Sequence, residues 1–367
     1  MHLLALEPYF AGSHRAFLEG WRARSRHRFT LLTLPGHHWK WRMRHAAVTF
    51  ADEIRARLAA GETWDALWAS SMLDLATLVG LAPRGLARLP RVVYFHENQA
   101  AYPVRHADCR DVHFSLIQMN AALAADAVWF NSRFCRDSFT AELARLLAKM
   151  PDHRLPGAPG RIDAVSAVHH PGIDPLPPRA AARQPGPLRL VWAARWEHDK
   201  GPDDLLAALD RLDQAGTDFR LSLLGEQFRD SPPAFAEIQR RFADRLDHVG
   251  YLPRRSDYLA ALQQADVFIS TARHEFFGLS AAEAAHAGCF PLLPRRLAYP
   301  ELFSDPDFFY DNAPAHLARR VRELADRLAA GNLWQGDPTR ARRVADRFTW
   351  PRQASALDDA LDDAAAR

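Results

Sequence analysis

Short apolar stretches alternate with longer amphipathic stretches along the whole chain, and most of them end at a turn residue. The apolar stretches read as strands and the amphipathic ones as helices. Alternation of this kind predicts a parallel sheet with helices on both faces, hence an α/β fold. The predicted strands are His2–Glu7, Phe29–Leu34, Ala66–Ser70, Arg91–His96, Ala127–Asn131 and Ala164–His169, then Leu188–Ala194, Leu221–Gly225, His248–Tyr251, Ala265–Thr271, Cys289–Leu293 and Asp307–Tyr310.

A proline-rich stretch separates the two sets of strands. Residues 171–187 read PGIDPLPPRAAARQPGP, which suits neither a helix nor a central strand because proline lacks the N–H donor. A helical segment is predicted from Leu317 to about Phe348, followed by a last amphipathic stretch. We predict an N-terminal domain (1–172), a linker (173–187), a C-terminal domain (188–347) and a C-terminal helix (348–367) that can return to the N-terminal domain. Two doubly wound, Rossmann-like domains facing each other would leave a central cleft at their strand ends.

Composition fits this picture of a two-domain protein. The chain has 367 residues, 48% of them hydrophobic, and a net charge of +3, which permits a nucleic-acid partner without demanding one. The apolar stretch Met1–Leu6 is interrupted at Glu7, and no stretch is long enough to span a membrane, so we expect a cytoplasmic protein without a membrane partner. Cys109, Cys135 and Cys289 lack disulfide or zinc-ligand spacing and are expected in the core. Nothing in the sequence indicates an oligomeric state.

The stretch Ala265–Gly288 reads as a strand, a loop and a helix that begins after Phe277-Gly278. Such a unit points its loop and the helix N-terminus out of the carboxyl end of the sheet, where an anion such as phosphate is favoured. Glu275 and Glu283 frame this site and could accept hydrogen bonds from sugar hydroxyls. The alternative is that both carboxylates only cap and solvate the helix.

A second candidate for anion binding follows the first strand of the second domain. Arg195 can hold phosphate oxygens with two hydrogen bonds, and Lys200 can add a point charge to the same group. Gly225, with Glu226 after it, ends the next strand, where glycine lets the backbone approach a ligand. The alternative is a surface ion-pair cluster with the neighbouring acidic residues. Two strand ends of one sheet that both offer anion-binding groups favour the ligand site.

Basic residues and tryptophans are interleaved in the first fifty residues. Such a mixture could hold a phosphate backbone and stack an unpaired base. The alternative is a solvated, Arg-rich surface with the tryptophans in the core. The residues concerned are Arg22, Arg24, Arg26, Arg28, Lys40, Arg42 and Arg44, with Trp21, Trp39 and Trp41 among them.

Arg195 and Lys200, followed downstream by Glu275 and, eight positions later, Glu283, resemble the donor-site signature of retaining GT-B glycosyltransferases of the glycosyltransferase 4 family. In that family the Arg and Lys hold the diphosphate, the first Glu contacts the sugar and the second takes the ribose hydroxyls. Many members have Gly after the first Glu, whereas this chain has Phe276.

A narrower resemblance, to the tRNA-queuosine mannosyltransferases, covers nearly the whole chain. It rests on His274–Gly278 (HEFFG) and on several motifs of the first half. These are Ala11–His14, Leu34-Pro35, Trp39–Arg42, Tyr94–Gln99, Tyr102-Pro103, Asn131-Ser132 and Pro151–Arg154.

His96 ends a strand beside Glu97 and Asn98, so it could face the reacting sugar, although a histidine at a strand end is often structural. Gly12 and Ser13 form a tight turn whose N–H groups could reach the leaving diphosphate. The candidate catalytic residues are His96, Arg195, Lys200 and Glu275. The candidate donor-binding residues are Gly12, Ser13, Arg195, Lys200, Gly225, Glu226, Glu275, Phe277, Gly278, Leu279 and Glu283. The candidate acceptor-binding residues are His14, Trp39, Lys40, Trp41, Arg42, Glu97, Asn98, Tyr102 and Asn131.

The resemblance implies transfer of mannose from GDP-mannose to the queuosine base of tRNA, with retention by front-face attack. It implies no metal or other cofactor, and it makes the nucleotide sugar and queuosine-containing tRNA the partners. In that case Trp39–Arg44 would grip the anticodon arm. Two alternatives stay open. One is a glycosyltransferase of the same fold that uses another nucleotide sugar and a lipid or saccharide acceptor, and the other is an RNA-binding or nucleotide-sugar-binding protein without turnover.

Overall fold

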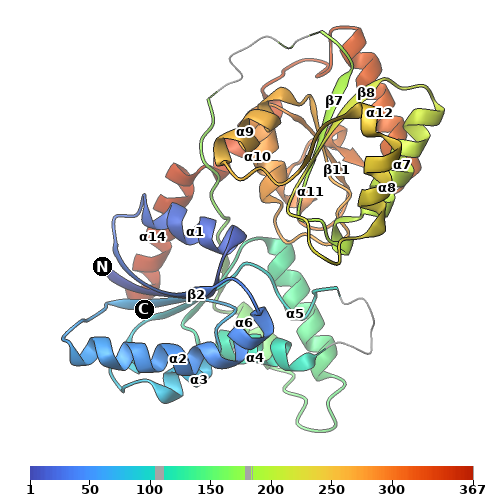
Figure 1. The fold of residues 1–367 in the computed structure, drawn as a ribbon. Coiled ribbons are helices and arrows are strands. Elements are labelled where there is room, and N and C mark those ends of the chain that lie inside the picture. The colour runs from blue at the N-terminus through green and yellow to red at the C-terminus, as the bar shows by residue number, and fades with distance from the viewer. Residues whose placement is uncertain (104–110, 178–182, 184, 367) are drawn as a thin grey trace. The chain divides into compact units, whose positions relative to one another are not determined.

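The structure is a computed structural model that describes residues 1–103, 111–177, 183 and 185–366. It divides into two compact units. Unit 1 consists of Met1–Gly172 together with the C-terminal helix from Trp350, and unit 2 consists of Ile173–Thr349. Each unit contains one six-stranded sheet in which every described strand pairing is parallel (Figure 1).

The sheet of unit 1 has the strand order β2-β1-β3-β4-β5-β6. Its direction of winding reverses between β1 and β3, and ligands of open α/β sheets bind at such a switch point. The elements of unit 1 are β1 (His2–Phe10), α1 (Gly12–Arg22), β2 (Arg28–Pro35), α2 (Trp39–Ala59), β3 (Ala66–Ser70), α3 (Leu75–Leu81), β4 (Arg91–Phe95), α4 (Val112–Ala124), β5 (Ala127–Phe130), α5 (Arg133–Leu147), α6 (Ala158–Asp163), β6 (Ser166–Val168) and α14 (Trp350–Ala366).

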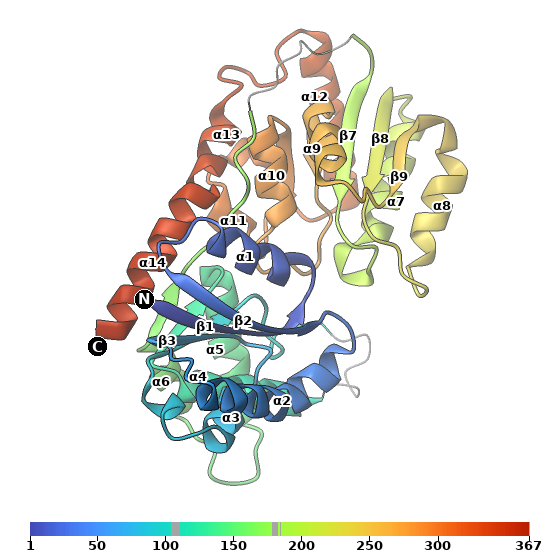
Figure 2. The same cartoon turned by 60° about the vertical axis from the view of Figure 1, so that its left-hand side comes forward.

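Helices cover both faces of this sheet, with α1 and α14 on one face and α2, α3 and α4 on the other (Figure 2). The core beneath α1 and α14 contains the buried Trp21 and residues of α14 such as Leu357. Trp350 anchors the start of α14 between two glycines, since a Cβ at Gly20 or Gly172 would lie 2.1 or 2.2 Å from its ring. The C-terminal helix is therefore an integral part of unit 1.

The sheet of unit 2 has the strand order β12-β11-β10-β7-β8-β9, so its switch point lies between β7 and β10. In Figure 1, α9 and α10 lie on one side of the strands, and α7, α8 and α12 lie on the other. The elements are β7 (Leu188–Ala193), α7 (Pro202–Gln214), β8 (Phe219–Leu224), α8 (Pro233–Arg241), β9 (Leu246–Gly250), α9 (Arg255–Gln264), β10 (Val267–Ile269), α10 (Leu279–Ala287), β11 (Phe290–Pro294), α11 (Tyr299–Leu302), β12 (Phe309–Tyr310), α12 (Pro314–Ala329) and α13 (Arg340–Ala345).

All twelve predicted strands are present, and β1 runs three residues beyond its predicted end. The helical segment predicted from Leu317 to about Phe348 is confirmed in part, because it is interrupted between α12, which ends at Ala329, and α13, which begins at Arg340. Gly331 and Gly336 between them have φ values of 71° and 132°, which a helix cannot contain, and Pro338 follows.

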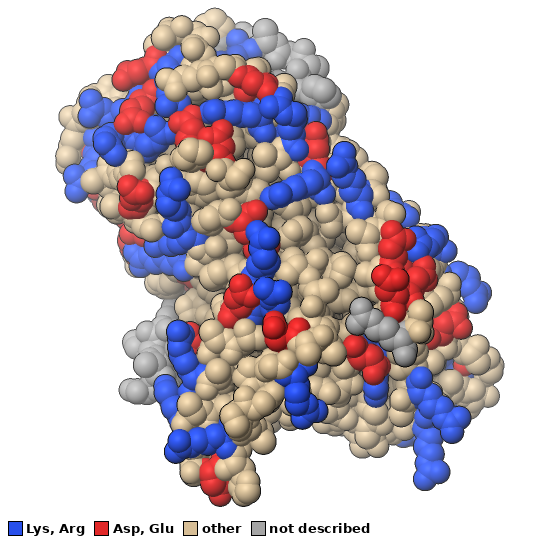
Figure 3. Space-filling model, turned by 180° about the vertical axis from the view of Figure 1, so that it is seen from behind, with Lys and Arg blue, Asp and Glu red and all other residues tan. Residues whose placement is uncertain are grey.

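Some sequence predictions fall partly outside the described residues. These are the part of the proline-rich linker at 178–182 and 184, and Cys109; Cys135 and Cys289 are buried as predicted. No described helix has the length and apolar character needed to cross a bilayer. On the face drawn in Figure 3, basic and acidic side chains are interspersed, as the small net charge of +3 leads one to expect.

Candidate active site

The loops that follow β7 and β10 are hydrogen-bonded to each other at the switch point of unit 2. Lys200 Nζ donates to the carbonyl of His274 at 2.9 Å, and Thr271 Oγ1 donates to the carbonyl of Lys200 at 2.8 Å. The backbone N–H groups of Arg273 and His274 both donate to the carbonyl of Asp199. The stretch that contains Lys200 and the stretch that contains Glu275, which were predicted as separate anion-binding candidates, therefore form one site.

The ammonium group of Lys200 lies between two carboxylates. Its Nζ is 3.2 Å from Asp199 Oδ2 and 3.4 Å from Glu275 Oε2, and only 11% of its side chain is exposed. Burial alone would lower the pKa of Lys200, but the charges of Glu275 and Asp199 outweigh burial and raise the pKa. Lys200 is therefore a permanent cation at the carboxyl edge of the sheet, suited to a phosphate oxygen.

Arg195 lies at the end of β7 and pairs with Glu197 at 3.2 Å, but 47% of its side chain stays exposed. The surface ion pair that was the alternative to a ligand-binding role for Arg195 is thus present. It leaves much of the Arg195 side chain accessible. Gly225 directly follows the neighbouring strand β8 and has a φ of 149°, and a Cβ there would lie 1.8 Å from the carbonyl oxygen of Ala194. Only glycine fits this close approach of two strand ends, beside the exposed Glu226.

The HEFFG motif packs its aromatic residues inward. Phe276 and Phe277 are 5% and 3% exposed, and the ring of Phe276 meets His274 edge-on at 4.3 Å. Gly278 precedes α10 with a φ of 105°, and a Cβ there would lie 2.8 Å from the ring of Tyr299. Burial, and next the neighbouring lysine, lower the pKa of His274 to about 4. Phe276, the departure from the wider family pattern, therefore fills a core position and not the anion site.

Glu283 lies on α10 and is held by two residues of α9. Arg255 pairs with its Oε1, and the hydroxyl of Tyr258 donates to its Oε2 at 3.0 Å. Burial, and next the charge of Glu283, raise the pKa of Tyr258 well above its ordinary value, so this hydroxyl keeps its proton. A carboxylate has about four acceptor positions, so an oriented Glu283 retains capacity for further hydroxyl groups.

In unit 1, a buried carboxylate and two histidines meet at the carboxyl end of β1. Glu7 is fully buried, and its Oε1 accepts from the N–H of Tyr9 at 2.8 Å and from Ser70 Oγ at 2.9 Å. Its Oε2 lies 3.0 Å from His14 Nδ1 and 3.9 Å from His96 Nε2. Because Ser70 ends β3, this cluster occupies the switch point of the unit 1 sheet.

His96 Nε2 is buried and has no hydrogen-bond partner among the described residues. Burial, and next the nearby His14, lower the pKa of His96 well below its ordinary value, so its imidazole is neutral. Glu7, His14 and His96 also form the one described group whose ligand atoms, all within 4.8 Å of one another, could hold a metal. The carboxylate already takes three hydrogen bonds, so the same geometry serves as a hydrogen-bonded network.

Two residues predicted to bind the acceptor support the loop around His96. Asn98 is fully buried; its amide donates to Cys135 O and Ser138 Oγ, and accepts from Ala101 N. Asn131 Nδ2 donates to the carbonyl of His96 at 2.6 Å. Glu97 and Tyr102 are partly exposed nearby in the chain. Asn98 and Asn131 therefore fix the backbone beside His96.

Gly12 and Ser13 begin α1 next to this cluster, and both are exposed. Gly12 has a φ of 50°, and a Cβ built on it would meet no described atom within 4 Å. The first turn of α1 is therefore open to solvent on the unit 1 surface, as an anion-binding turn requires.

The basic and tryptophan-rich region of the sequence separates into two places. Arg22 to Arg28 lie before or at the start of β2, where Arg26 pairs with Asp359 of α14, and Trp21 is fully buried. Trp39 to Arg44 follow the other end of the eight-residue β2, which spans roughly 26 Å at about 3.3 Å per residue. The prediction that the tryptophans lie in the core is thus confirmed for Trp21, whereas Trp41 is 59% exposed.

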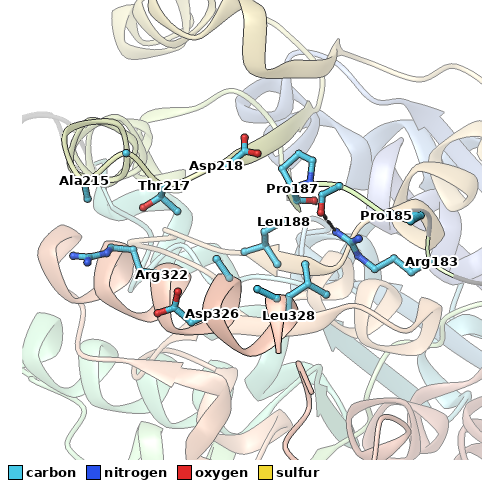
Figure 4. Close-up of a pocket in the computed structure, with 14 residues that line it drawn as sticks. Arg183, Pro185, Pro187, Leu188, Ala215, Thr217, Asp218, Arg322, Asp326 and Leu328 are labelled. Atoms are coloured by element: carbon cyan, nitrogen blue, oxygen red, sulfur yellow. Dashed lines mark hydrogen bonds between the residues drawn. The ribbon is translucent and has the colours of Figure 1, made fainter. Parts of the chain in front are cut away.

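A hollow of about 570 Å³ lies on unit 2 away from these loops (Figure 4). Its lining includes Leu188, the first residue of β7, and Asp218, just before β8. Arg183 closes one side and donates to the carbonyl of Pro187 at 2.6 Å. The hollow is therefore at the amino ends of the strands, opposite the edge that carries Lys200.

Three residues of these clusters, Glu7, Arg255 and Tyr258, were not predicted from the sequence. Glu7 is the single charged residue in the otherwise apolar β1, and a buried carboxylate without a role is rare, so this signal was available. Arg255 and Tyr258 had no local signal, because their contact with Glu283 arises only when α9 packs beside α10.

Solved structures that resemble this chain define its fold. A sucrose-phosphate synthase from Thermosynechococcus elongatus superposes with a TM-score of 0.73 and 16% identity over all of both chains. Anabaena Alr3699/HepE in complex with UDP superposes with a TM-score of 0.68 and 14% identity, covering 99% of this chain and 100% of the other. With two Rossmann-like sheets and such neighbours, the chain has the GT-B glycosyltransferase fold.

Sequence relatives define the family within that class. Residues 2–173 match the tRNA-queuosine alpha-mannosyltransferase N-terminal family, and residues 178–327 match the family Glycosyl transferases group 1. A tRNA-queuosine alpha-mannosyltransferase of Drosophila melanogaster is 35% identical over 322 residues, 84% of this chain and 83% of that one. This chain belongs to the tRNA-queuosine alpha-mannosyltransferase family.

A more distant relative matches over about half of each chain. It is a GDP-mannose-dependent alpha-(1-6)-phosphatidylinositol dimannoside mannosyltransferase of Mycobacterium tuberculosis (strain ATCC 25177 / H37Ra), 31% identical over 54% of this chain and 52% of that one.

Proposed function

We propose that this chain transfers mannose from GDP-mannose to the queuosine base of tRNA. The observation that carries the proposal is the 35% identity, over 84% of the chain, to a relative named for that acceptor and sugar. The GDP part of the donor is supported by the mycobacterial relative, whose name specifies GDP-mannose. A tRNA acceptor would put the reaction in the cytoplasm.

The residues of unit 2 suit the donor. Lys200, held between carboxylates, and the half-exposed Arg195 supply the positive charge for a diphosphate and for the charge that develops as it leaves. Glu275 would take hydroxyls of mannose, and Glu283 would take those of the ribose. Both glutamates are already oriented by their basic neighbours.

The proposed reaction forms a bond between an acceptor hydroxyl oxygen and the anomeric carbon of mannose, and breaks the bond from that carbon to the diphosphate. The acceptor proton goes to the leaving diphosphate, and attack on the same face gives retention. Glu275 is assigned to donor binding, so no glycosyl-enzyme intermediate is required.

We assign His96 Nε2, a neutral group with open hydrogen-bonding capacity, to a hydroxyl of the reacting sugar. No metal takes part in this scheme, and EDTA treatment should leave the rate unchanged.

The test is to incubate the purified protein with GDP-mannose and with tRNA that contains or lacks queuosine, and to digest the product to nucleosides. Mass spectrometry should find a hexose on queuosine only in the first sample, and an α-mannosidase, not a β-mannosidase, should remove it. Absence of the product with GDP-mannose, but its presence with another nucleotide sugar, would overturn the donor assignment alone. Absence with every nucleotide sugar would overturn the tRNA assignment.

A further inference from the structure

The surface at the start of α2 carries an aromatic side chain held open to solvent. Trp41 is 59% exposed, and its ring stacks on the ring of His45 with centroids 4.9 Å apart and an angle of 29°. The two residues are four positions apart on the helix and so share one face. A single exposed tryptophan is common on protein surfaces, but this one is stacked on a ring that is itself held in place.

His45 is fixed through both ring nitrogens. Its Nε2 lies 3.0 Å from Arg42 Nη1, and its Nδ1 lies 2.9 Å from Thr49 Oγ1. Because Arg42 can only donate, Nε2 accepts and Nδ1 carries the proton. Burial, and next the charge of Arg42, lower the pKa of His45, which agrees with a neutral ring. The imidazole under Trp41 is therefore fixed in one orientation and supports one face of the indole ring.

The basic residues around this pair have different tasks. Arg42 is occupied locally, because its other donors reach Pro35 O at 3.1 Å and His37 Nε2 at 3.2 Å. Arg44 pairs with Asp111. Lys40 is exposed, and within the described residues its ammonium group makes no hydrogen bond or ion pair, although its Nζ lies 5.7 Å from the centre of the Trp39 ring. Lys40 is thus the cation beside Trp41 that is available to a phosphate.

The charge of this segment favours a polyanionic partner. Residues 36–51, which follow β2, contain three Arg or Lys and no Asp or Glu. Trp39, two residues before Trp41, packs with Tyr9 against the same small core cluster, and the ring of Tyr9 meets His14 edge-on at 5.8 Å. Packed side chains therefore connect Trp39, which is in the same helical turn as Trp41, with the Glu7 cluster inside unit 1.

We infer that Trp41, stacked on His45, is a platform for an unpaired nucleobase that flanks the reacting nucleotide of the acceptor RNA, with Lys40 on an adjacent phosphate. This inference rests on the proposed function for the identity of the RNA. A flat aromatic ring stacks on any base, and a neighbouring cation supplies the backbone contact, so the pair suits single-stranded loop nucleotides. Arg42 is a positioning residue that acts through His45.

The test compares Trp41→Ala, Trp41→Phe and Val48→Ala in binding to purified queuosine-containing tRNA. Val48, on the same helix and 51% exposed, is the matched control. We expect Trp41→Ala to weaken binding by about 5- to 150-fold, the value of one stacked base, and Trp41→Phe and Val48→Ala by less than about threefold. Lys40→Met should lower the slope of log affinity against log salt by about one. The urea unfolding midpoint and the GDP affinity should stay unchanged in all four variants, which shows that unit 1 and unit 2 are both folded.

An abasic scan of the anticodon loop makes the test specific. At one position, removal of the base should weaken wild-type binding as much as Trp41→Ala does, and should have no further effect in that variant. If the wild type modifies queuosine and Trp41→Ala binds the tRNA equally well, the inference is wrong and the proposed function stands. Loss of self-association in Trp41→Ala, with tRNA affinity unchanged, would likewise overturn it in favour of a contact between copies. A wild type that neither binds nor modifies tRNA would overturn both.

Discussion

The rings of His14 and His96 lie with centroids 4.0 Å apart, and both approach the same carboxylate oxygen of Glu7. Glu7→Gln keeps an oxygen for the N–H of Tyr9, but it places an amide where His14 Nδ1 donates, which removes the acceptor that orients this ring. We expect kcat to fall by roughly ten- to a hundredfold with the KM for GDP-mannose unchanged.

Ser70→Ala is the matched control for Glu7, because Ser70 donates to the other oxygen of the carboxylate. It should reduce kcat by only a few-fold and shift thermal unfolding as much as Glu7→Gln does. Equal kcat values for the two variants would show that Glu7 acts only in stability.

Arg195 and Lys200 should respond differently to truncation, although both are assigned to the diphosphate. Arg195→Ala removes a half-exposed side chain and should lower kcat about 10²- to 10³-fold without changing the unfolding midpoint. Lys200→Ala also leaves Asp199 and Glu275 without their shared cation, which should cost roughly 3 kcal/mol of stability. Urea unfolding beside steady-state kinetics separates the two; a destabilised Arg195→Ala would contradict the assignment.

Glu283 depends on α9 for its orientation. Tyr258→Phe removes the hydrogen bond to Oε2, worth about 1 kcal/mol, and should weaken GDP binding by about fivefold. Glu283→Gln should weaken it by at least as much, since the ribose hydroxyls lose a charged acceptor. Isothermal titration calorimetry of each variant with GDP and with guanosine measures these changes in affinity. An unchanged GDP affinity in Glu283→Gln would show that Glu283 has only a structural role, as a link between α9 and α10.

The hydrogen bonds that Asp358 of α14 accepts should affect only the stability of the fold. Asp358 is buried and accepts from Trp21 Nε1 at 2.7 Å, Ser25 Oγ at 2.6 Å and Arg26 N at 2.8 Å. Asp358→Ala should lower the free energy of unfolding by roughly 3 kcal/mol and leave GDP affinity intact. The neighbouring Asp359, 65% exposed and paired only at the surface, should cost under about 0.5 kcal/mol when changed to Ala.

The buried His274 and the partly buried His169 should make the fold sensitive to acid. Burial, followed by a neighbouring charge, lowers the pKa of His169 and of His274 from 6.5 to about 4. Above pH 6.5 both rings are neutral whether the chain is folded or unfolded. As pH falls towards 4, the unfolded chain binds protons that the folded chain does not, and stability drops by roughly 3 kcal/mol per histidine. Urea unfolding across this range should show the loss, and His169→Gln should reduce its slope; an equal slope would exclude His169.

Strand positions could be predicted because a buried strand is a local run of apolar residues, as at Ala66–Ser70, where the prediction and the structure coincide. The proximity of Lys200 and Glu275 was also within reach, since parallel strands end at one edge of the sheet. The break between α12 and α13 was signalled by Gly331 and Gly336 but was masked by the helical spacing around it.

Other features depend on contacts between distant segments. Trp21 is buried and Trp41 is exposed because they lie on different faces of their helices relative to the core. The separation of Arg26 from Lys40 follows from the length of β2. The bond from Glu7 to His14 depends on how α1 turns back over β1. No local pattern of residues predicts these features.

Unit 2 is inserted into unit 1, and its first and last residues, Ile173 and Thr349, lie side by side in an isolated parallel bridge. During synthesis on the ribosome, the core of unit 1 stays incomplete until Trp350 and the rest of α14 have emerged. The second unit is therefore the first to have all its residues available for folding. Its adjacent ends also mean that a short connection could replace it and leave unit 1 as an independent protein.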